Sequence, residues 1–301
     1  MKDKQKVPVQ AEKLGGPNIQ KLGIKAEYYI DSAEKLPELP PLNDANINLT
    51  IRQPLNQKDV AVVLIDLQKD FTTYYANQAV RGGRLGVPVP VPETINEPKS
   101  DEVYIQKTIQ ATKYFHEKGL KIIGTLDSHP QDHISFASNH IGQKDEHGND
   151  IIPNVSRIIL PDGRPQIMWP DHCVRPDSSM KPENAGGIQT YIPWQYFTIL
   201  FPKGTQQNFD SYSGAQDKGG TSTGLIEYLN TNLINHVIVY GLATDVCVAD
   251  TVVDLQQKGI EVTVVLDLCR AAFSTKKGVR NMESVGATVL DSLESDNTIQ
   301  M

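Results

Sequence analysis

Short runs of aliphatic and β-branched residues alternate along the chain with segments whose apolar residues recur at helical spacing. The continuous apolar runs lie at 60–65, 121–126, 197–201, 237–240, 261–266 and 287–290. The helical pattern lies at 100–118, 225–233, 247–258 and 274–285. Continuous apolar runs of this length are typical of strands buried on both faces, and helices between them predict βαβ units. We therefore expect a three-layer α/β/α fold with a mainly parallel central sheet.

Two regions do not follow this alternation. Residues 1–58 are rich in Lys, Asn, Pro and Leu and have no sustained period, which predicts an N-terminal extension that wraps the domain or a neighbouring subunit. One domain then spans 59–295. Within it, residues 138–170 carry Gly, Asn, Asp and Pro without a period, and we expect an insertion that covers one edge of the sheet.

The composition is that of an ordinary globular protein. The 301 residues are 39% hydrophobic and 22% charged, and the net charge of −7 argues against nucleic acid or a membrane surface as a partner. Three scattered cysteines do not form a disulfide framework, and no apolar run approaches membrane-spanning length. We expect a cytoplasmic protein.

Four reactive side chains lie at or just after the ends of predicted strands. They are Asp66, Asp127, Lys203 and Cys247. Because ligands of parallel sheets bind beyond the carboxyl ends of the strands, these side chains are expected to share one edge. Each of them alone is nearly as compatible with a structural role, but together they favour catalysis.

Cys247 is predicted at a strand-to-helix corner, in the first turn of the helix. Such a position favours a thiolate, and the backbone N–H groups there are suited to holding an oxyanion. The alternative is a small buried apolar residue. Asp66 closes a buried strand, where desolvation raises a carboxyl pKa toward that of a general base, and Lys203 would hold both groups by charge. Here the alternative is a structural ion pair between Asp66 and Lys203.

A second cluster combines a carboxylate with imidazoles. Asp127 and His129 are two residues apart at a strand end, so both point to one side, and His172 offers a third ligand. One carboxylate and two imidazoles suit one divalent ion, Zn or Fe(II), with Mn also possible. The alternative is a hydrogen bond between Asp127 and His129 without a metal.

The remaining histidines, cysteines and aromatic residues receive simpler interpretations. His133 is expected to line the pocket, while His140 and His147 are expected in exposed loops. Cys173 is given a packing role and Cys269 a place in the core. Phe71, Tyr75 and Trp169 lie in sequence near the acid and the ligands, and are candidates for stacking on a flat ring, although aromatic residues are more often core.

Five segments carry a family resemblance when taken together and in order. They read LIDLQKDF, TLDSHPQDHISFASNH, MWPDHCV, FPKGTQQNFDSYSG and VYGLATDVCVADTVVDLQQKG. The stretch from Val60 to Leu290 resembles the nicotinamidases (pyrazinamidases) of the isochorismatase-like cysteine hydrolase superfamily. One departure is Asp127-Ser128-His129, where many nicotinamidases have Asp-Trp-His.

The resemblance implies a role for each matching residue. Cys247, Asp66 and Lys203 would form the catalytic triad, and Asp127, His129 and His172 would bind the metal. A cis peptide is expected at Leu242–Ala243, with the N–H groups of Ala243 and Cys247 forming the oxyanion hole.

The implied activity is hydrolysis of nicotinamide to nicotinate and ammonia through a Cys247 thioester, in NAD salvage. Pyrazinamide is expected as a second substrate, zinc as the metal and a homo-oligomer as the assembly. The alternatives are another small amide or ureido substrate, or a non-catalytic scaffold on the same fold.

Overall fold

The computed structural model describes residues 42, 47, 59–72, 85–86, 101–176 and 186–294. Its main element is a six-stranded sheet in the order β5-β2-β1-β6-β7-β8, with every neighbouring pair parallel. The strands are β1 (Val60–Ile65), β2 (Lys121–Asp127), β5 (Ile199–Lys203), β6 (His236–Leu242), β7 (Glu261–Arg270) and β8 (Thr288–Leu290). All six strands of the predicted sheet are confirmed.

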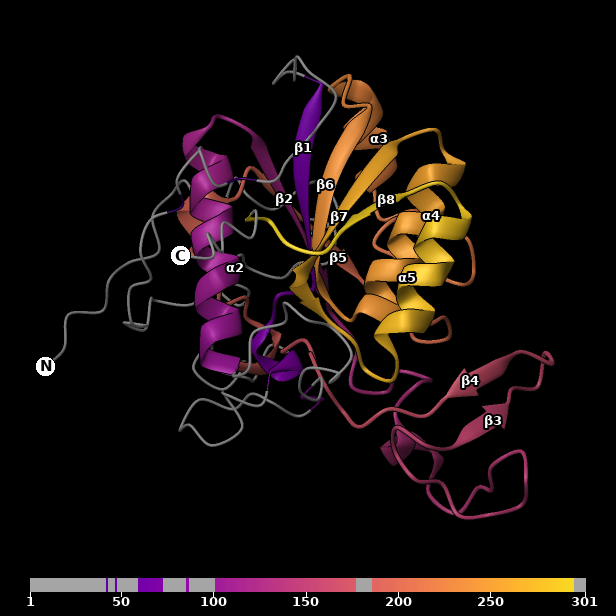
Figure 1. The fold of residues 1–301 in the computed structure, drawn as a ribbon. Helices are drawn as coiled ribbons and strands as arrows, with labels where there is room; N and C mark the ends of the chain where they lie inside the picture. The colour runs from indigo at the N-terminus through magenta and orange to yellow at the C-terminus, as the bar shows by residue number, and fades with distance from the viewer. Residues whose placement is uncertain are drawn as a thin grey trace, which may run out of the picture.

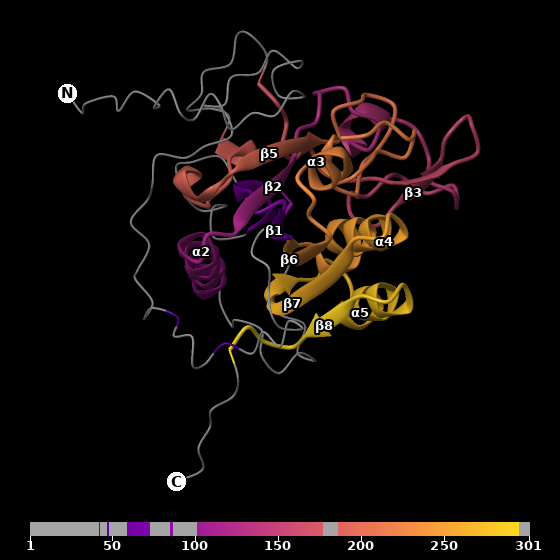
Figure 2. The ribbon, with the colours of Figure 1, turned by 90° about the horizontal axis from the view of Figure 1, so that it is seen from above.

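Helices cover both faces of this sheet. Helix α2 (Asp101–Glu117) lies on one face, and α3 (Leu225–Thr231), α4 (Ala249–Gln257) and α5 (Thr275–Ser284) lie on the other (Figures 1 and 2). Every residue of β1 is buried, as the continuous apolar run of that strand requires. The three-layer α/β/α prediction is confirmed.

Local signals in the sequence fix several helix ends. The Ser274 hydroxyl caps α5 by accepting a hydrogen bond from the Lys277 N–H. Helix α2 begins with Asp101 and Glu102, where carboxylates complement the positive end of the helix dipole. The chain then turns at Gly119, whose φ of 80° favours glycine.

Short helical elements lie in the loops of the described chain. They are η4 (Lys69–Phe71), η6 (Ala137–His140), η8 (Gly186–Ile188), η9 (Trp194–Tyr196) and the π-helical turn η10 (Thr244–Val248). The last of these differs from the prediction, because Cys247 lies in a π turn that precedes α4 and not in the first turn of α4 itself.

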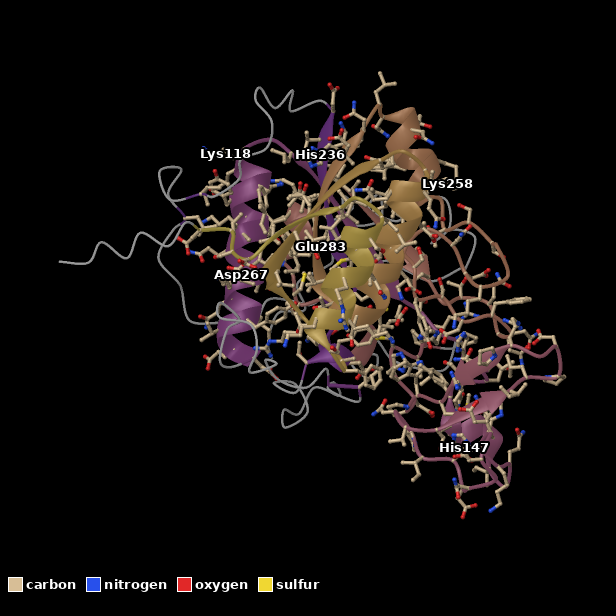
Figure 3. All side chains as sticks on the ribbon, turned by 45° about the vertical axis from the view of Figure 1, so that its right-hand side comes forward. Lys118, His147, His236, Lys258, Asp267 and Glu283 are labelled. Atoms are coloured by element: carbon tan, nitrogen blue, oxygen red, sulfur yellow. The ribbon has the colours of Figure 1, made fainter. Side chains whose placement is uncertain are left out.

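The predicted insertion contains a hairpin that its sequence did not indicate. β3 (Arg157–Ile159) and β4 (Pro165–Ile167) pair antiparallel as a separate two-stranded sheet. This region projects from the body of the molecule and does not lie along an edge of the main sheet (Figure 1). Figure 3 shows His147 on this projection, far from Lys258 and Glu283 on the α4 and α5 side.

Most of the predicted N-terminal extension lies outside the described residues, as does Tyr75. Two of its residues are described: Leu42 and Ile47 both pack against the core, and Ile47 also forms an antiparallel bridge with Glu294. Among the described helices, none combines the length and the apolar character that crossing a membrane requires.

Candidate active site

The three predicted catalytic side chains meet at the carboxyl ends of β5, β1 and β6. Lys203, the last residue of β5, places its Nζ 2.9 Å from Asp66 Oδ2 and 3.5 Å from Cys247 Sγ. The same ammonium group donates to the Ser211 carbonyl over 2.8 Å and contacts the Asp127 carboxylate. All of these side chains are buried, so Lys203 links the nucleophile, the acid and the second carboxylate in a buried network.

Burial sets the protonation state of the acid and the thiol. Desolvation raises the pKa of Asp66 to about 6, against the lowering effect of Lys203. Burial also raises the pKa of Cys247 well above its usual value, and the neighbouring carboxylates add to that rise. The expectation that the corner position favours a thiolate is therefore wrong for the resting site. Cys247 is a thiol there, and Asp66 is the group positioned to take its proton.

Asp127 is held ionised by its neighbours. Burial alone would raise its pKa, but Lys203 and His129 together hold the pKa well below its usual range. Its backbone is fixed by Gln68, whose side-chain amide donates to the Asp127 carbonyl over 2.9 Å and accepts from the Asp127 N–H over 2.7 Å. Gln68 thus continues the hydrogen-bond pattern of the sheet past the end of β1.

Asp66 is oriented by the strand beside it. The Thr125 hydroxyl of β2 donates to Asp66 Oδ1 over 2.8 Å, which leaves Oδ2 facing Lys203. Asp66 has a φ of 49°, in the left-handed region, and this conformation turns the chain sharply at the end of β1. At the next strand, Gly241 passes so close to β1 that an added Cβ would overlap the Ile65 carbonyl oxygen.

The peptide bond between Leu242 and Ala243 is cis, as the family resemblance implies. It joins the end of β6 to the π turn that carries Cys247. The Ala243 carbonyl accepts hydrogen bonds from the N–H groups of Val246 and Val248, and these bonds close the turn that carries Cys247. Ala243 and Cys247 both line the cavity described below.

The predicted metal ligands also come together. One ligand atom from each of Asp127, His129 and His172 lies within 4.8 Å of the others, and all three residues are buried. The Nε2 atoms of the two histidines lie 3.4 and 3.6 Å from Asp127 Oδ2. Atoms that bind one zinc ion at about 2.1 Å in a tetrahedron are about 3.4 Å apart, so this spacing fits a single ion.

The other ring nitrogens of these histidines support the same interpretation. His129 Nδ1 donates to the Gly204 carbonyl over 3.0 Å, and His172 Nδ1 donates to the Pro170 carbonyl over 2.7 Å. Each bond fixes the tautomer in which Nε2 has a free lone pair, and both Nε2 atoms face Asp127. The donor set therefore fits a divalent metal better than a simple hydrogen bond between Asp127 and His129.

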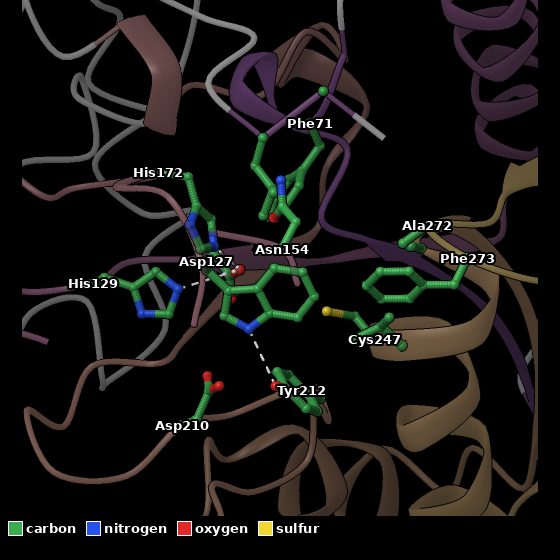
Figure 4. Close-up of a pocket in the computed structure, with 15 residues that line it drawn as sticks. Phe71, Asp127, His129, Asn154, His172, Asp210, Tyr212, Cys247, Ala272 and Phe273 are labelled. Carbon is green, nitrogen blue, oxygen red and sulfur yellow. Dashed lines mark hydrogen bonds and ion pairs between the residues drawn. The ribbon is translucent and has the colours of Figure 1, made fainter. Parts of the chain in front are cut away.

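A cavity of about 280 Å³ joins the nucleophile to this cluster. Figure 4 shows the Cys247 sulfur pointing into it, with His129 and His172 beyond Asp127. Its other walls are largely aromatic: Phe71 and Trp169, as predicted, together with Tyr212 and Phe273. The Trp169 indole donates to the Tyr212 hydroxyl over 3.1 Å, which holds the two rings as a T-shaped pair.

His133 does not line this cavity, and that prediction is corrected. Its ring is buried behind His129, with a centroid separation of 4.3 Å, and it bonds Ser135 Oγ at 2.7 Å. Burial lowers the pKa of His133 to about 3, so it is neutral. Tyr75 lies outside the described residues. Cys173 and Cys269 are both buried, and neither forms a disulfide within the described residues, in agreement with packing roles.

Several residues with a part in the site did not emerge from the sequence. Asp210 and Tyr212 line the cavity, and Gln68 supports Asp127 from behind. Asp70 accepts a hydrogen bond from the Cys173 N–H over 2.7 Å and so fixes the loop that carries His172. Gln68 and Asp70 could have been found, because both are polar residues within five positions of the end of the buried strand β1.

Comparison with known proteins identifies the family. The isochorismatase domain model matches residues 208–294. The nicotinamidase of Escherichia coli is 31% identical over 236 residues, an alignment that covers 76% of this chain and 93% of that protein. The chain belongs to the nicotinamidase family. The nicotinamidase of Acinetobacter baylyi is 38% identical over 151 residues, which cover 50% of this chain and 63% of that protein.

Solved nicotinamidase structures share the fold. The Acinetobacter baumanii nicotinamidase/pyrazinamidase is 27% identical with a TM-score of 0.59, over 79% of this chain and 97% of its own. The pyrazinamidase of Pyrococcus horikoshii, solved in complex with zinc, is 25% identical with a TM-score of 0.53, over 77% of this chain and 98% of its own. The isochorismatase-like fold prediction is therefore confirmed.

Proposed function

We propose that this nicotinamidase-family protein hydrolyses nicotinamide to nicotinate and ammonia, cleaving a linear amide C–N bond in NAD salvage. The observation that carries the proposal is the meeting of Cys247, Asp66 and Lys203 beside a small aromatic cavity that ends in a carboxylate–imidazole cluster. A scaffold without catalysis would have no need for a buried, mutually paired acid, amine and thiol.

The residues support a two-stage reaction. Asp66 takes the thiol proton, and the Cys247 sulfur attacks the carboxamide carbon while the N–H groups of Ala243 and Cys247 bind the oxyanion. As the C–N bond breaks, Asp66 returns the proton to the departing ammonia and a thioester remains. Asp66 then takes a proton from water, and the oxygen of that water adds to the thioester carbonyl. The C–S bond breaks, Asp66 returns the proton to the Cys247 sulfur, and the acid product loses its own proton to solvent and leaves as nicotinate.

Lys203 stabilises the charged groups that take part in this proton transfer. Its charge stabilises the thiolate when it forms. Its contacts with Asp66 and Asp127 also offset the repulsion between these two buried carboxylates. Without this ammonium group Asp66 would bind its proton too tightly to act as a base.

Asp127, His129 and His172 are the residues that would hold the metal, and zinc suits one carboxylate and two imidazoles best, with iron or manganese as alternatives. The ion, when bound, supplies a Lewis acid for the ring nitrogen of the substrate. Phe71 and Trp169 would hold the flat ring from its faces, and this places the carboxamide toward Cys247. Pyrazinamide, which also presents a ring nitrogen and a carboxamide, is proposed as a second substrate.

A short panel of amides tests the proposal. Ammonia release is measured for nicotinamide, pyrazinamide, benzamide and an N-carbamoyl amino acid, with kcat/KM determined for each. We expect nicotinamide and pyrazinamide to have the highest kcat/KM values, and benzamide, which has no ring nitrogen, to have a much lower one. If the ureido compound had the highest kcat/KM of the panel, the same triad would serve a different substrate. A cytoplasmic location and a homo-oligomeric assembly stay predictions from the sequence.

A further inference from the structure

The inserted region 138–170 contributes a polar side chain to the rim of the cavity. Asn154 lines the cavity together with Phe71, Asp127 and Trp169, although Asn154 and Asp127 are far apart in the sequence. In the view of Figure 4, Asn154 and Phe71 lie on one side of the Cys247 sulfur and Tyr212 lies on the other. The insertion is therefore part of the site and is not confined to the projecting hairpin.

The position of Asn154 is set by the backbone around it. Its N–H donates to the Met168 carbonyl over 2.7 Å, which ties it to the residue that precedes Trp169. Its φ of 66° lies in the left-handed region, which asparagine adopts more readily than most residues. Met168 and Ser156 are joined by a further backbone bond, so the turn is anchored at the base of the hairpin.

Most polar groups in the cavity wall already have partners or a chemical role. Asp127, His129 and His172 form the metal-type cluster. Asp210 accepts hydrogen bonds from the Ser211 N–H over 2.9 Å and from the Gln166 side chain over 2.7 Å.

Asn154 differs from these groups. Its side-chain amide makes no hydrogen bond with any residue in the described part of the chain, and Asn154 is exposed at the rim of the cavity. A free carboxamide offers both donors and an acceptor to a ligand.

We propose that Asn154 is a specificity-determining residue that recognises a hydrogen-bonding substituent on the ring of the substrate. The inference rests on the proposed function. In the proposed function nicotinamide would present its carboxamide to Cys247 and its ring nitrogen to the Asp–His–His cluster, and the remaining ring edge would then face the rim with Asn154. The substrate class is thus widened to pyridine carboxamides with an amino or hydroxyl group on that edge.

The test compares aminonicotinamides with the methylnicotinamides of nearly the same shape, substituted at ring carbon five or six. The quantity is the ratio of kcat/KM for the amino compound to that for the methyl compound. Asn154→Gly removes the side chain and keeps the positive φ available. Because one neutral hydrogen bond at a partly solvated rim is worth a modest free energy, we expect this ratio to fall by about threefold to tenfold at one of the two positions.

Two further variants make the outcome decisive. Asn154→Asp keeps an acceptor for the amino group and should retain the preference, while Val155→Ala, a change at the neighbouring residue outside the cavity wall, should leave the ratio unchanged. The inference would be overturned if the ratio were the same in the wild type and Asn154→Gly at both ring positions. It would also be overturned if the wild type hydrolysed none of the substituted amides. A wild type inactive on nicotinamide itself would instead remove the proposed function, and the inference with it.

Discussion

At the scale of single residues, the site depends on the balance between burial and charge around Asp66. Burial raises the pKa of this carboxyl, and Lys203 limits the rise, so the value settles at about 6. A carboxylate with this pKa is ionised at neutral pH and yet basic enough to accept a thiol proton. The neighbouring Asp127 has the opposite shift because two imidazoles and Lys203 surround it.

This balance predicts the acid side of the pH profile. Asp66 must be ionised to accept the Cys247 proton, so protonation below its pKa removes the base. We expect kcat/KM for nicotinamide to fall about tenfold for each pH unit below roughly pH 6, since one proton is involved. Asp66→Asn should lower kcat by at least about 10²-fold. A kcat/KM that stays constant down to about pH 4.5 would contradict this role for Asp66.

Lys203 is expected to contribute to stability as well as to catalysis. Lys203→Met leaves Asp66 and Asp127 buried without their shared cation, and removing one partner of a buried ion pair costs about 3–5 kcal/mol. The free energy of unfolding in urea measures this. The control is Lys113→Met, which removes an exposed lysine 3.9 Å from Glu117 and should cost less than about 0.5 kcal/mol. Equal losses for both variants would show that the buried network adds no stability.

At the scale of elements, the sequence predicted what continuous apolar runs and helix caps determine. All six strands of the sheet follow from such runs, and the Ser274 cap fixes the start of α5. The start of β5 was placed two residues early, because the apolar run begins at Phe197 before the chain enters the sheet at Ile199. The hairpin was missed because each of its strands has three residues and only one of these is buried.

The turn after β5 yields a test of the second cluster. Gly204 has a φ of 63°, and an added Cβ would overlap the His129 ring. Gly204→Ala should therefore move this imidazole and weaken metal binding by about 10–100-fold, the usual cost of disturbing the support of a ligand. Competition with a chromophoric chelator measures the affinity. Gly220→Ala is the control, because Gly220 has a φ of 84° and open space around it. If both variants bound metal as the wild type does, His129 would not be a ligand.

At the scale of the whole molecule, the site is assembled from segments far apart in the chain. Asp66, Asp127, Lys203 and Cys247 could be placed together from the sequence, because a parallel sheet brings the carboxyl ends of its strands to one edge. Asp210, Tyr212 and Asn154 could not, since they lie in loops whose paths depend on tertiary contacts such as the bond between Gln166 and Asp210. His133 was misplaced for the same reason.

The metal-type cluster joins two distant segments, one with Asp127 and His129 and one with His172, so a bound ion should stabilise the whole fold. Treatment with a strong chelator is expected to abolish nicotinamide hydrolysis and lower the melting temperature, and added Zn²⁺ should restore both. At 100 times its dissociation constant the ion would add about 2.7 kcal/mol to the unfolding free energy. In His172→Ala this thermal shift should largely disappear. A wild-type melting temperature that is indifferent to chelator and to Zn²⁺ would contradict the cluster as a metal site.

The central claim is that Cys247, activated by Asp66 and Lys203, attacks nicotinamide. The most direct measurement is rapid quenching of the protein with nicotinamide, followed by peptide mass spectrometry. We predict a nicotinoyl group on Cys247 in the wild type, no adduct in Cys247→Ala, and ammonia release lower by at least about 10⁴-fold in that variant. Ammonia release from nicotinamide by Cys247→Ala at the wild-type rate, or an adduct on Cys173 in place of Cys247, would contradict the account.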